Sequence, residues 1–207
     1  MKIAFLGGGS FGGNLAQLLA QSGHDVVVGL RDTGRARSGA TYRCDSFEHA
    51  IAHGEVVVIA LPYLVCATVL PKFAGQLSGK IVVDATNPLR EDWSPLPLGA
   101  ENSAAEELSR LLPSARLVKA FNTIFADIIR AEQLEQRAER LTAFIAGDDL
   151  AANRIIAEIA ASAGFAPLVT GRLGNARYLE AMANLNIQIA VVHGGGTNAG
   201  YVYRQHL

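Results

Sequence analysis

The stretch that decides the fold is "FLGGGSFGGN", residues 5–14. Three of its glycines, Gly7, Gly9 and Gly12, have the spacing G-x-G-x-x-G. An apolar segment precedes the stretch and an amphipathic segment follows it, so the glycines join a predicted strand to a predicted helix. In that setting the first glycine allows a tight turn, the second lets a pyrophosphate approach the backbone, and the third lets the helix pack close to the sheet. The stretch therefore predicts a dinucleotide-binding turn.

The rest of the chain alternates predicted strands with predicted helices. Near-continuous apolar strands in such an order are typical of a parallel sheet that is covered on both faces. We therefore expect the α/β class, with a doubly wound, mostly parallel sheet of the Rossmann type and a C-terminal helix. Residues 1–207 form a single domain in this prediction, and residues 172–207 form its C-terminal helical extension. Seven apolar segments are the predicted strands: 2–6, 25–30, 55–61, 80–85, 115–121, 141–147 and 166–170.

The second predicted strand ends in arginine rather than in an acid. The stretch "VVVGLRDTGRAR", residues 26–37, places Arg31 roughly 20 residues after Gly12, where a carboxylate usually binds the ribose 2′-hydroxyl. A guanidinium offers forked donors and positive charge to a 2′-phosphate instead, and Arg35 lies one turn further on if the chain is helical. This pattern favours NADP(H) over NAD(H) and predicts an NADP-binding domain. Asp32 keeps the alternative open, because its carboxylate could accept a ribose hydroxyl.

The composition excludes several classes of partner. The 207 residues are 50% hydrophobic and 18% charged with a formal net charge of −1, so we expect a globular chain that does not bind nucleic acid. No apolar run reaches the roughly 18 to 20 residues that cross a bilayer, so we expect no membrane partner. Cys44 and Cys66 form no C-x-x-C pair and no metal-ligand cluster. The expectation is a cytoplasmic protein without a metal site.

Two segments fall outside the strand–helix alternation. The connection 86–102 contains three prolines and no periodicity, and a structureless loop of that length is usually a lid or a pocket wall. The last long helical segment is apolar on more than one side, around Tyr178 to Val192. A helix of this kind is either buried or paired with another chain, and we expect it to form a homodimer interface.

Six motifs are spread over nearly the whole chain: "GGGSFGGNLAQLLAQSGHDVVVGLRD", "ALPYLV", "VVDATNPL", "ENSAAEELSRLLPSARLVKAFNTIFA", "AGDD" and "GNARYLEAMANLNI". Together they resemble the NADP oxidoreductases that use the deazaflavin coenzyme factor 420, and they are also similar to the oxidoreductase domain of the STEAP metalloreductases. The resemblance implies an NADPH-dependent oxidoreductase. It would transfer hydride between NADP(H) and factor 420 or, as alternative acceptors, FMN or FAD.

The resemblance also implies which residues bind the cofactors. Gly9, Ser10 and Phe11 match the pyrophosphate loop of the family, and Arg31 and Arg35 match basic residues at the 2′-phosphate. The positions where the family lines the adenosine and ribose are Pro62, Tyr63 and Ala67, and those where the nicotinamide should lie are Asn87, Pro88, Asn122, Thr123 and Ala126.

No residue is assigned a catalytic role. Hydride transfer between a nicotinamide and a flavin-type ring needs little from side chains, because the cofactors carry the chemistry. Lys119 is interpreted as a strand residue that faces solvent, and Glu180 as an acid on a helix surface. Glu180 also occupies the position at which the β-hydroxyacid dehydrogenases carry a lysine, so alcohol oxidation by their route is not expected.

Two other functions remain compatible with these residues. The first is a non-catalytic NADP(H) sensor, which would bind the nucleotide without turnover. The second is an NADPH-dependent reductase of a small carbonyl or imine compound, with a pocket built from the loop 86–102. Both share the predicted small-molecule cofactor, NADP(H). The sensor would transfer no hydride, and the reductase would transfer it to a small organic compound instead of a flavin-type ring.

Overall fold

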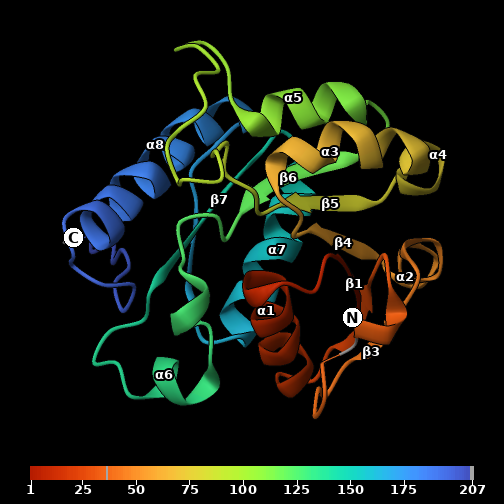
Figure 1. Cartoon of the computed structure of the whole chain (residues 1–207), viewed down its shortest axis with the longest axis horizontal. Helices are drawn as coiled ribbons and strands as arrows, with labels where there is room; N and C mark the ends of the chain where they lie inside the picture. Colours follow the sequence, from red (N-terminus) through yellow and green to blue (C-terminus); the bar gives the residue numbers. More distant parts are fainter. Residues whose placement is uncertain (36, 206–207) are drawn as a thin grey trace.

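The structure, a computed structural model, describes residues 1–35 and 37–205. Its centre is an eight-stranded sheet with the order β3-β2-β1-β4-β5-β6-β7-β8 (Figure 1). All neighbouring strands are parallel except β6 and β7, which are antiparallel. The prediction of an α/β fold with a mostly parallel sheet is confirmed. The strands are β1 (Lys2–Leu6), β2 (Asp25–Gly29), β3 (Arg43–Asp45), β4 (Val56–Ile59), β5 (Ile81–Asp84), β6 (Arg116–Ala120), β7 (Thr142–Gly147) and β8 (Ala166–Val169).

One strand was not predicted. β3 pairs with β2 through Val27 and Arg43, Val28 and Cys44, and Gly29 and Asp45. It has three residues, is at the edge of the sheet and has no buried residue. A strand that buries no side chain leaves no apolar run in the sequence, and this is why the sequence pattern missed it.

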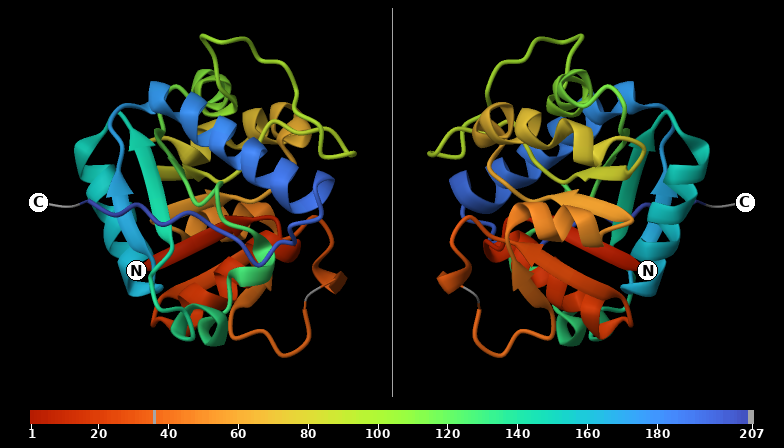
Figure 2. Two further views of the ribbon diagram at one scale, coloured as in Figure 1. Left: turned by 90° about the vertical axis from the view of Figure 1, so that its left-hand side faces the viewer. Right: turned by 90° about the vertical axis from the view of Figure 1, so that its right-hand side faces the viewer.

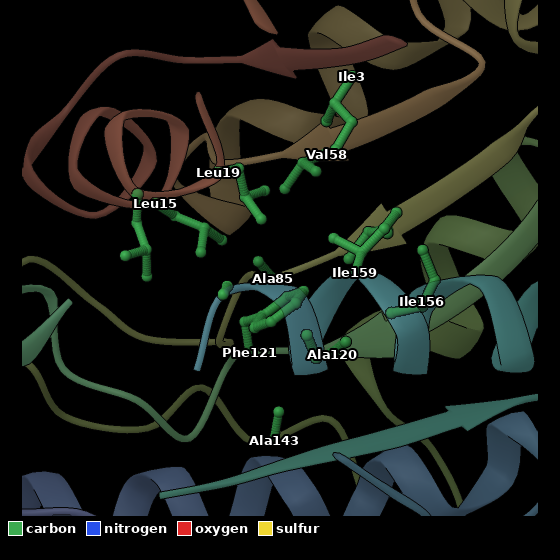
Figure 3. Packing of buried hydrophobic residues seen from close by; sticks show 14 of the residues in the cluster. Ile3, Leu15, Leu19, Val58, Ala85, Ala120, Phe121, Ala143, Ile156 and Ile159 are labelled. Atoms are coloured by element: carbon green, nitrogen blue, oxygen red, sulfur yellow. The ribbon is translucent and has the colours of Figure 1, made fainter. Parts of the chain in front are cut away.

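Two helices cover one face of the sheet. α1 (Ser10–Gln21) and α7 (Leu150–Ser162) pack their apolar sides onto alternate residues of the central strands. In Figure 3, Leu19 of α1 lies beside Val58, while Ile156 and Ile159 of α7 lie close to Ala120 and Phe121. Every labelled side chain in that view is buried, so this layer fixes the position of α1 against the sheet.

The opposite face is covered by more helices, most of which are shorter. A second apolar cluster joins this layer to the other faces of β1, β4 and β5. α8 lies against β7, where Leu179 packs on Phe144 and Ala146. The helices of this layer are α2 (Phe47–His53), α3 (Tyr63–Val69), α4 (Ala74–Leu77), α5 (Ala104–Leu111) and α8 (Ala176–Ile187), and α8 continues as a π-helix over Gln188–Val192.

The chain after the π-helix is extended and returns across the sheet (Figure 2). The Thr142 N–H donates to the carbonyl of Tyr201 at 2.8 Å, and the Tyr203 N–H donates to the Thr142 hydroxyl at 2.8 Å. The Tyr201 hydroxyl donates to the Met182 carbonyl at 2.8 Å, which ties the segment to α8. In the described part of 172–207, the helical structure therefore stops at Val192. Within the described residues, no helix combines the length and the apolar character needed to cross a membrane.

Candidate functional site

The glycine-rich turn lies between β1 and α1, and two of its glycines have no room for a side chain. Gly7 has φ +108°, and a Cβ there would lie 2.5 Å from the carbonyl oxygen of Ala60. A Cβ on Gly12 would lie 2.8 Å from the Cβ of Ala60 and would overlap the carbonyl oxygen of Gly7. Gly9 is different, because no atom lies within 4 Å of its Cβ position. The open side of the turn is therefore at Gly9, where a ligand can approach the backbone.

The first turn of α1 is suited to an anion. Gly9 is the N-cap residue, and no side chain in the described structure caps this end of the helix. The first N–H groups of a helix have no partner within the helix and carry partial positive charge. Ser10 is exposed and Phe11 is half-buried, so both predicted pyrophosphate-loop residues border the open side. The residues present fit a dinucleotide pyrophosphate.

The predicted 2′-phosphate residues lie in the connection after β2. Arg31 is exposed, and Arg35 ends the short 3-10 helix Thr33–Arg35. The side chain of Arg35 lies outside the described part of the structure. The competing residue Asp32 accepts the Gly34 N–H at 3.0 Å through Oδ1 and so turns toward its own loop. Arg31 is thus exposed, two residues beyond the carboxyl end of β2.

Two hydrogen bonds that the sequence did not suggest join the segment after β2 to the 3-10 helix on the other side of α1. Arg37 donates to Oδ1 of Asn14 at 2.8 Å, and the amide nitrogen of Asn14 donates to the carbonyl of Ala126 at 2.8 Å. Asn14 is in α1 and is buried, and Ala126 begins the 3-10 helix Ala126–Ile128. The predicted nicotinamide residue Ala126 is therefore held beside the dinucleotide turn.

The predicted adenosine residues lie at the carboxyl end of β4. Pro62 is the N-cap residue of α3, while Tyr63 and Ala67 are in that helix. Pro62 and Ala67 are exposed. The hydroxyl of Tyr63 donates to a carboxylate oxygen of Glu107 on α5. Burial and this hydrogen bond raise the pKa of Tyr63, so it stays protonated at neutral pH and its hydroxyl points at α5.

Two of the predicted nicotinamide residues bind each other across the strand ends. The side-chain amide of Asn87 donates to the Asn122 carbonyl at 2.8 Å, and that of Asn122 donates to Oδ1 of Asn87 at 2.9 Å. Asn122 also donates to the Leu179 carbonyl of α8 at 3.1 Å. Thr123 is buried next to it. Phe121, the residue before, has φ +63°, an uncommon conformation for a large side chain.

The structure brings these predicted residues to one edge of the sheet. β1, β2, β4, β5 and β6 are mutually parallel, so the turn at Gly9, the loop at Arg31, and the segments after Ile59, Asp84 and Ala120 all leave from their carboxyl ends. The strand order reverses between β1 and β4, and ligands of doubly wound sheets bind at this position.

A cavity of about 150 Å³ adjoins the Asn87 end of this edge. It lies between α8 and the loop 86–102, which stands out from the surface next to α5 in Figure 2. The loop therefore walls a pocket. Asn87 and Pro88 line it, whereas Asn122, Thr123 and Ala126 are not among the residues that do. The side-chain oxygen of Asn184, another lining residue, is buried and has no hydrogen-bond partner within the described structure.

The predictions for Lys119 and Glu180 are wrong. Lys119 is 0% exposed rather than solvent-facing, and Glu180 is 7% exposed rather than on a helix surface. Lys119 Nζ lies 2.9 Å from Asp84 Oδ2 and 2.8 Å from Glu180 Oε1. The two carboxylates outweigh the effect of burial and raise the pKa of Lys119, so the ammonium stays charged.

A signal for this network was present in the sequence. Lys119 stands in the apolar run "RLVKAF", which was itself predicted to be a strand covered on both faces. A lysine in such a strand has no solvent-facing side and needs an anionic partner. The register of the sheet supplies one, because Asp84 of β5 is paired with Lys119 of β6. No group of three or more His, Cys, Asp or Glu side chains arranged to hold a metal occurs among the described residues.

Comparison with known proteins finds a matching family, similar reductases and a similar solved structure. The family model described as "NADP oxidoreductase coenzyme F420-dependent" matches residues 2–88. The F420-dependent NADP reductase of Methanothermobacter thermautotrophicus is 30% identical, over 94% of this chain and 93% of its own length. The crystal structure of a putative F420-dependent NADP-reductase from Arthrobacter sp. FB24 superposes with a TM-score of 0.86 at 28% identity, covering 99% of this chain and 100% of that one.

The metalloreductase STEAP3 of Rattus norvegicus is also similar, at 36% identity over 183 residues. The match covers 87% of this chain but 36% of the length of that relative, so the chain spans about a third of a STEAP metalloreductase. By contrast, the match to the Methanothermobacter reductase runs over nearly the whole of both proteins. The chain belongs to the family of coenzyme F420-dependent NADP oxidoreductases.

Proposed function

We propose that the protein transfers hydride between NADP(H) and a planar acceptor, with the deazaflavin coenzyme F420 as first choice and FMN or FAD as alternatives. One observation carries this proposal. The open dinucleotide turn and the cavity walled by the loop 86–102 lie at the same carboxyl edge of one sheet. Relatives that match over nearly their whole length are named F420-dependent NADP reductases, which supports the deazaflavin.

The choice of NADP(H) rests on the connection after β2. Arg31 and Arg35 supply two positive charges where an acid would select NAD(H), and Asp32 is turned toward Gly34. A 2′-phosphate would gain charge-assisted hydrogen bonds from these guanidinium groups. The pyrophosphate would lie on the N-terminus of α1 at Gly9, Ser10 and Phe11.

The chain's own residues have a positioning role in this proposal. The nicotinamide and the acceptor ring carry the hydride chemistry when they are bound. Asn87 and Asn122 hold the ends of β5 and β6 together and would orient the nicotinamide. Pro88 and the apolar residues of the loop would exclude water from the acceptor, which lowers the cost of bringing the two rings into reacting distance.

The test is a spectral assay with NADPH and, in turn, F420, FMN and FAD. We expect the absorbance of the oxidised deazaflavin to disappear with NADPH and to do so more slowly with NADH. Reduction of FMN or FAD alone would keep the hydride transfer but replace the acceptor. If NADPH binds but is consumed neither with these three acceptors nor with carbonyl or imine compounds, the protein is a nucleotide sensor. NADPH consumption with carbonyl or imine compounds alone would make it a reductase of that class.

The proposed assembly is a homodimer through the outer face of α8 and its π-helical extension. Tyr178, Leu185 and Val192 follow each other at intervals of seven residues, so they lie along one face of this helix. Their exposed fractions are 68%, 56% and 63%. Exposed apolar residues in such a stripe are typical of an interface between chains. Sedimentation equilibrium of the wild type and of Leu185→Glu tests this, because the charge should shift a dimer toward half its mass. A wild-type monomer would contradict it.

The proposed location is the cytoplasm. Cys44 and Cys66 are both free thiols, which agrees with a reducing compartment. Cell fractionation with an antibody against the native chain tests this. Recovery in a membrane or secreted fraction would contradict it.

A further inference from the structure

One buried ammonium holds together several walls of the candidate acceptor pocket. Lys119 Nζ donates to Asp84 Oδ2 at 2.9 Å, to the Thr86 carbonyl at 2.7 Å and to Glu180 Oε1 at 2.8 Å. These partners belong to the end of β5, to the beginning of the loop 86–102 and to α8. The three donors of the ammonium are therefore all used, each on a different part of the structure.

The same network reaches the other end of the loop. Glu180 accepts the N–H of Ala104 at 2.9 Å through Oε2 and the N–H of Ala105 at 3.2 Å through Oε1. These N–H groups open α5, which follows the loop directly. Both ends of the loop 86–102 are thus fastened to one carboxylate–ammonium pair, and that pair also fixes α8, the opposite wall of the cavity.

A gain in folding stability does not by itself explain a buried ion-pair network of this kind. One ammonium faces two carboxylates, so the buried group carries one excess negative charge, offset by the partial positive charge of the α5 N-terminus. Buried ion pairs repay their desolvation poorly, and apolar replacements of similar size are often as stable. What the charged network provides is direction: five N–H donors and four acceptor oxygens set the positions of the loop ends and α8 relative to each other.

We propose that Lys119 is a positioning residue for the acceptor, which sets the spacing between the loop 86–102 and α8 and thus the width of the slot for a planar ring. This inference rests on the proposed function. A cavity of about 150 Å³ is large enough for a benzene-sized ring, so it would receive one edge of a tricyclic acceptor. Lys119 is 0% exposed and acts only through the groups that it holds.

The decisive variant is the double substitution Asp84→Asn and Lys119→Met. Both side chains are fully buried, so neither change removes a contact with a ligand. The net charge of the network stays at one negative charge, now on Glu180, which keeps its two N–H donors from α5. Only the three hydrogen bonds of the ammonium are lost. Lys80→Met is the matched control, because the Lys80 ammonium donates to the Gly54 carbonyl at 2.6 Å just before β5, at the end of that strand opposite to the loop 86–102.

We expect the double variant to bind NADPH with its dissociation constant changed by less than about twofold, while kcat/KM for the acceptor falls about 10- to 100-fold, as for a misplaced reactant. Hydrogen exchange should accelerate at residues 86–105 and nowhere else to the same extent. Lys80→Met should change neither quantity. Equal losses in NADPH binding and acceptor turnover, or an unchanged acceptor kcat/KM, would overturn the inference.

A second variant covers the case in which the double variant does not fold. Glu180→Gln replaces one of the two accepting oxygens by an NH2 group, so the acceptor of Lys119 and Ala105 and the acceptor of Ala104 can no longer both be present. Faster exchange of the Ala104 and Ala105 amides is expected, and unchanged protection there contradicts the clamp. This readout needs no turnover. If the wild type reduces no acceptor, the proposed function fails while the exchange measurement still decides whether the network holds the loop.

Discussion

At the scale of single residues, the dinucleotide turn separates glycines that packing requires from one that packing does not require. Gly12 has backbone and side-chain atoms of Gly7 and Ala60 where its Cβ would be, while Gly9 has empty space. Gly9 also has φ −64° and ψ −174°, a conformation that alanine adopts readily. The two positions therefore respond differently to the same substitution.

The first prediction compares Gly9→Ala with Gly12→Ala. Gly9→Ala should melt at nearly the wild-type temperature but bind NADPH at least tenfold more weakly, because the methyl group occupies the space of the pyrophosphate. Gly12→Ala should lose about 1 to 3 kcal/mol of unfolding free energy, the usual cost of overpacking. Thermal melts and NADPH titrations of both variants check this. Tight NADPH binding by Gly9→Ala would show that the pyrophosphate does not lie there.

The second prediction concerns Arg31. Replacing it with glutamine removes a charge-assisted hydrogen bond to the 2′-phosphate, a loss of about 1.5 to 3 kcal/mol in NADPH binding. NADH has no such phosphate, so its affinity should not change and the preference for NADPH should shrink by at least tenfold. Arg43→Gln is the control, because Arg43 is exposed on β3 and pairs with Asp25 at 3.1 Å. An equal loss for both nucleotides would mean that Arg31 binds something other than the 2′-phosphate.

At the scale of helices and strands, one of the contacts between α5 and α8 depends on the carboxylate of Glu106. Glu106 accepts from Arg177 at 2.9 and 2.7 Å and from the Ser103 hydroxyl at 2.7 Å. The guanidinium of Arg177, together with the Ser103 hydroxyl, lowers the pKa of Glu106 below its ordinary value of 4.5, although burial opposes them. The pairing thus favours the ionised form, and the folded protein holds this proton more weakly than the unfolded chain.

The third prediction follows from the sign of that shift. A lowered folded-state pKa adds stability that is fully present above pH 4.5 and is lost as the pH falls through the lower folded value. The melting temperature should therefore drop on acidification below pH 4.5. In Arg177→Gln this drop should be shallower, because the guanidinium no longer holds the carboxylate ionised. Melts of both proteins between pH 3 and 7 measure it, and parallel curves would contradict the assignment to Glu106.

Which elements could be predicted depended on how much of each was buried. The central strands could be located from their apolar runs, whereas β3 has no buried residue and therefore no apolar run in the sequence. The loop 86–102 was predicted as a wall from its length and prolines. Its fastening to Lys119 and Glu180 was not, because that depends on the pairing of β5 with β6 and on the packing of α8 against α5. Local patterns do not encode such distant contacts, although a charged residue inside an apolar run marks where one must exist.

At the scale of the whole molecule, parallel pairing collects residues that are far apart in the sequence. The ends of β1, β2, β4, β5 and β6 form one edge, and Asn14 in α1 bridges Arg37 on one side of it to Ala126 on the other. The candidate site therefore uses contacts from both halves of the sheet. A ligand that fills it should stabilise the entire domain rather than a single loop, since it contacts segments on both sides of the strand-order reversal.

The fourth prediction is the size and selectivity of that stabilisation. NADPH at 100 times its dissociation constant adds about 2.7 kcal/mol to the free energy of unfolding. For a domain of this length, each kcal/mol raises the melting temperature by about 2 to 4 °C, so a rise of about 5 to 10 °C is expected. NADH at the same concentration should give a smaller rise, because it lacks the phosphate that Arg31 is proposed to bind. Gly9→Ala provides the control: its fold is intact but its turn is blocked, so at that NADPH concentration its melting temperature should rise by much less. An equal rise in Gly9→Ala would place the nucleotide away from the carboxyl edge and contradict the site.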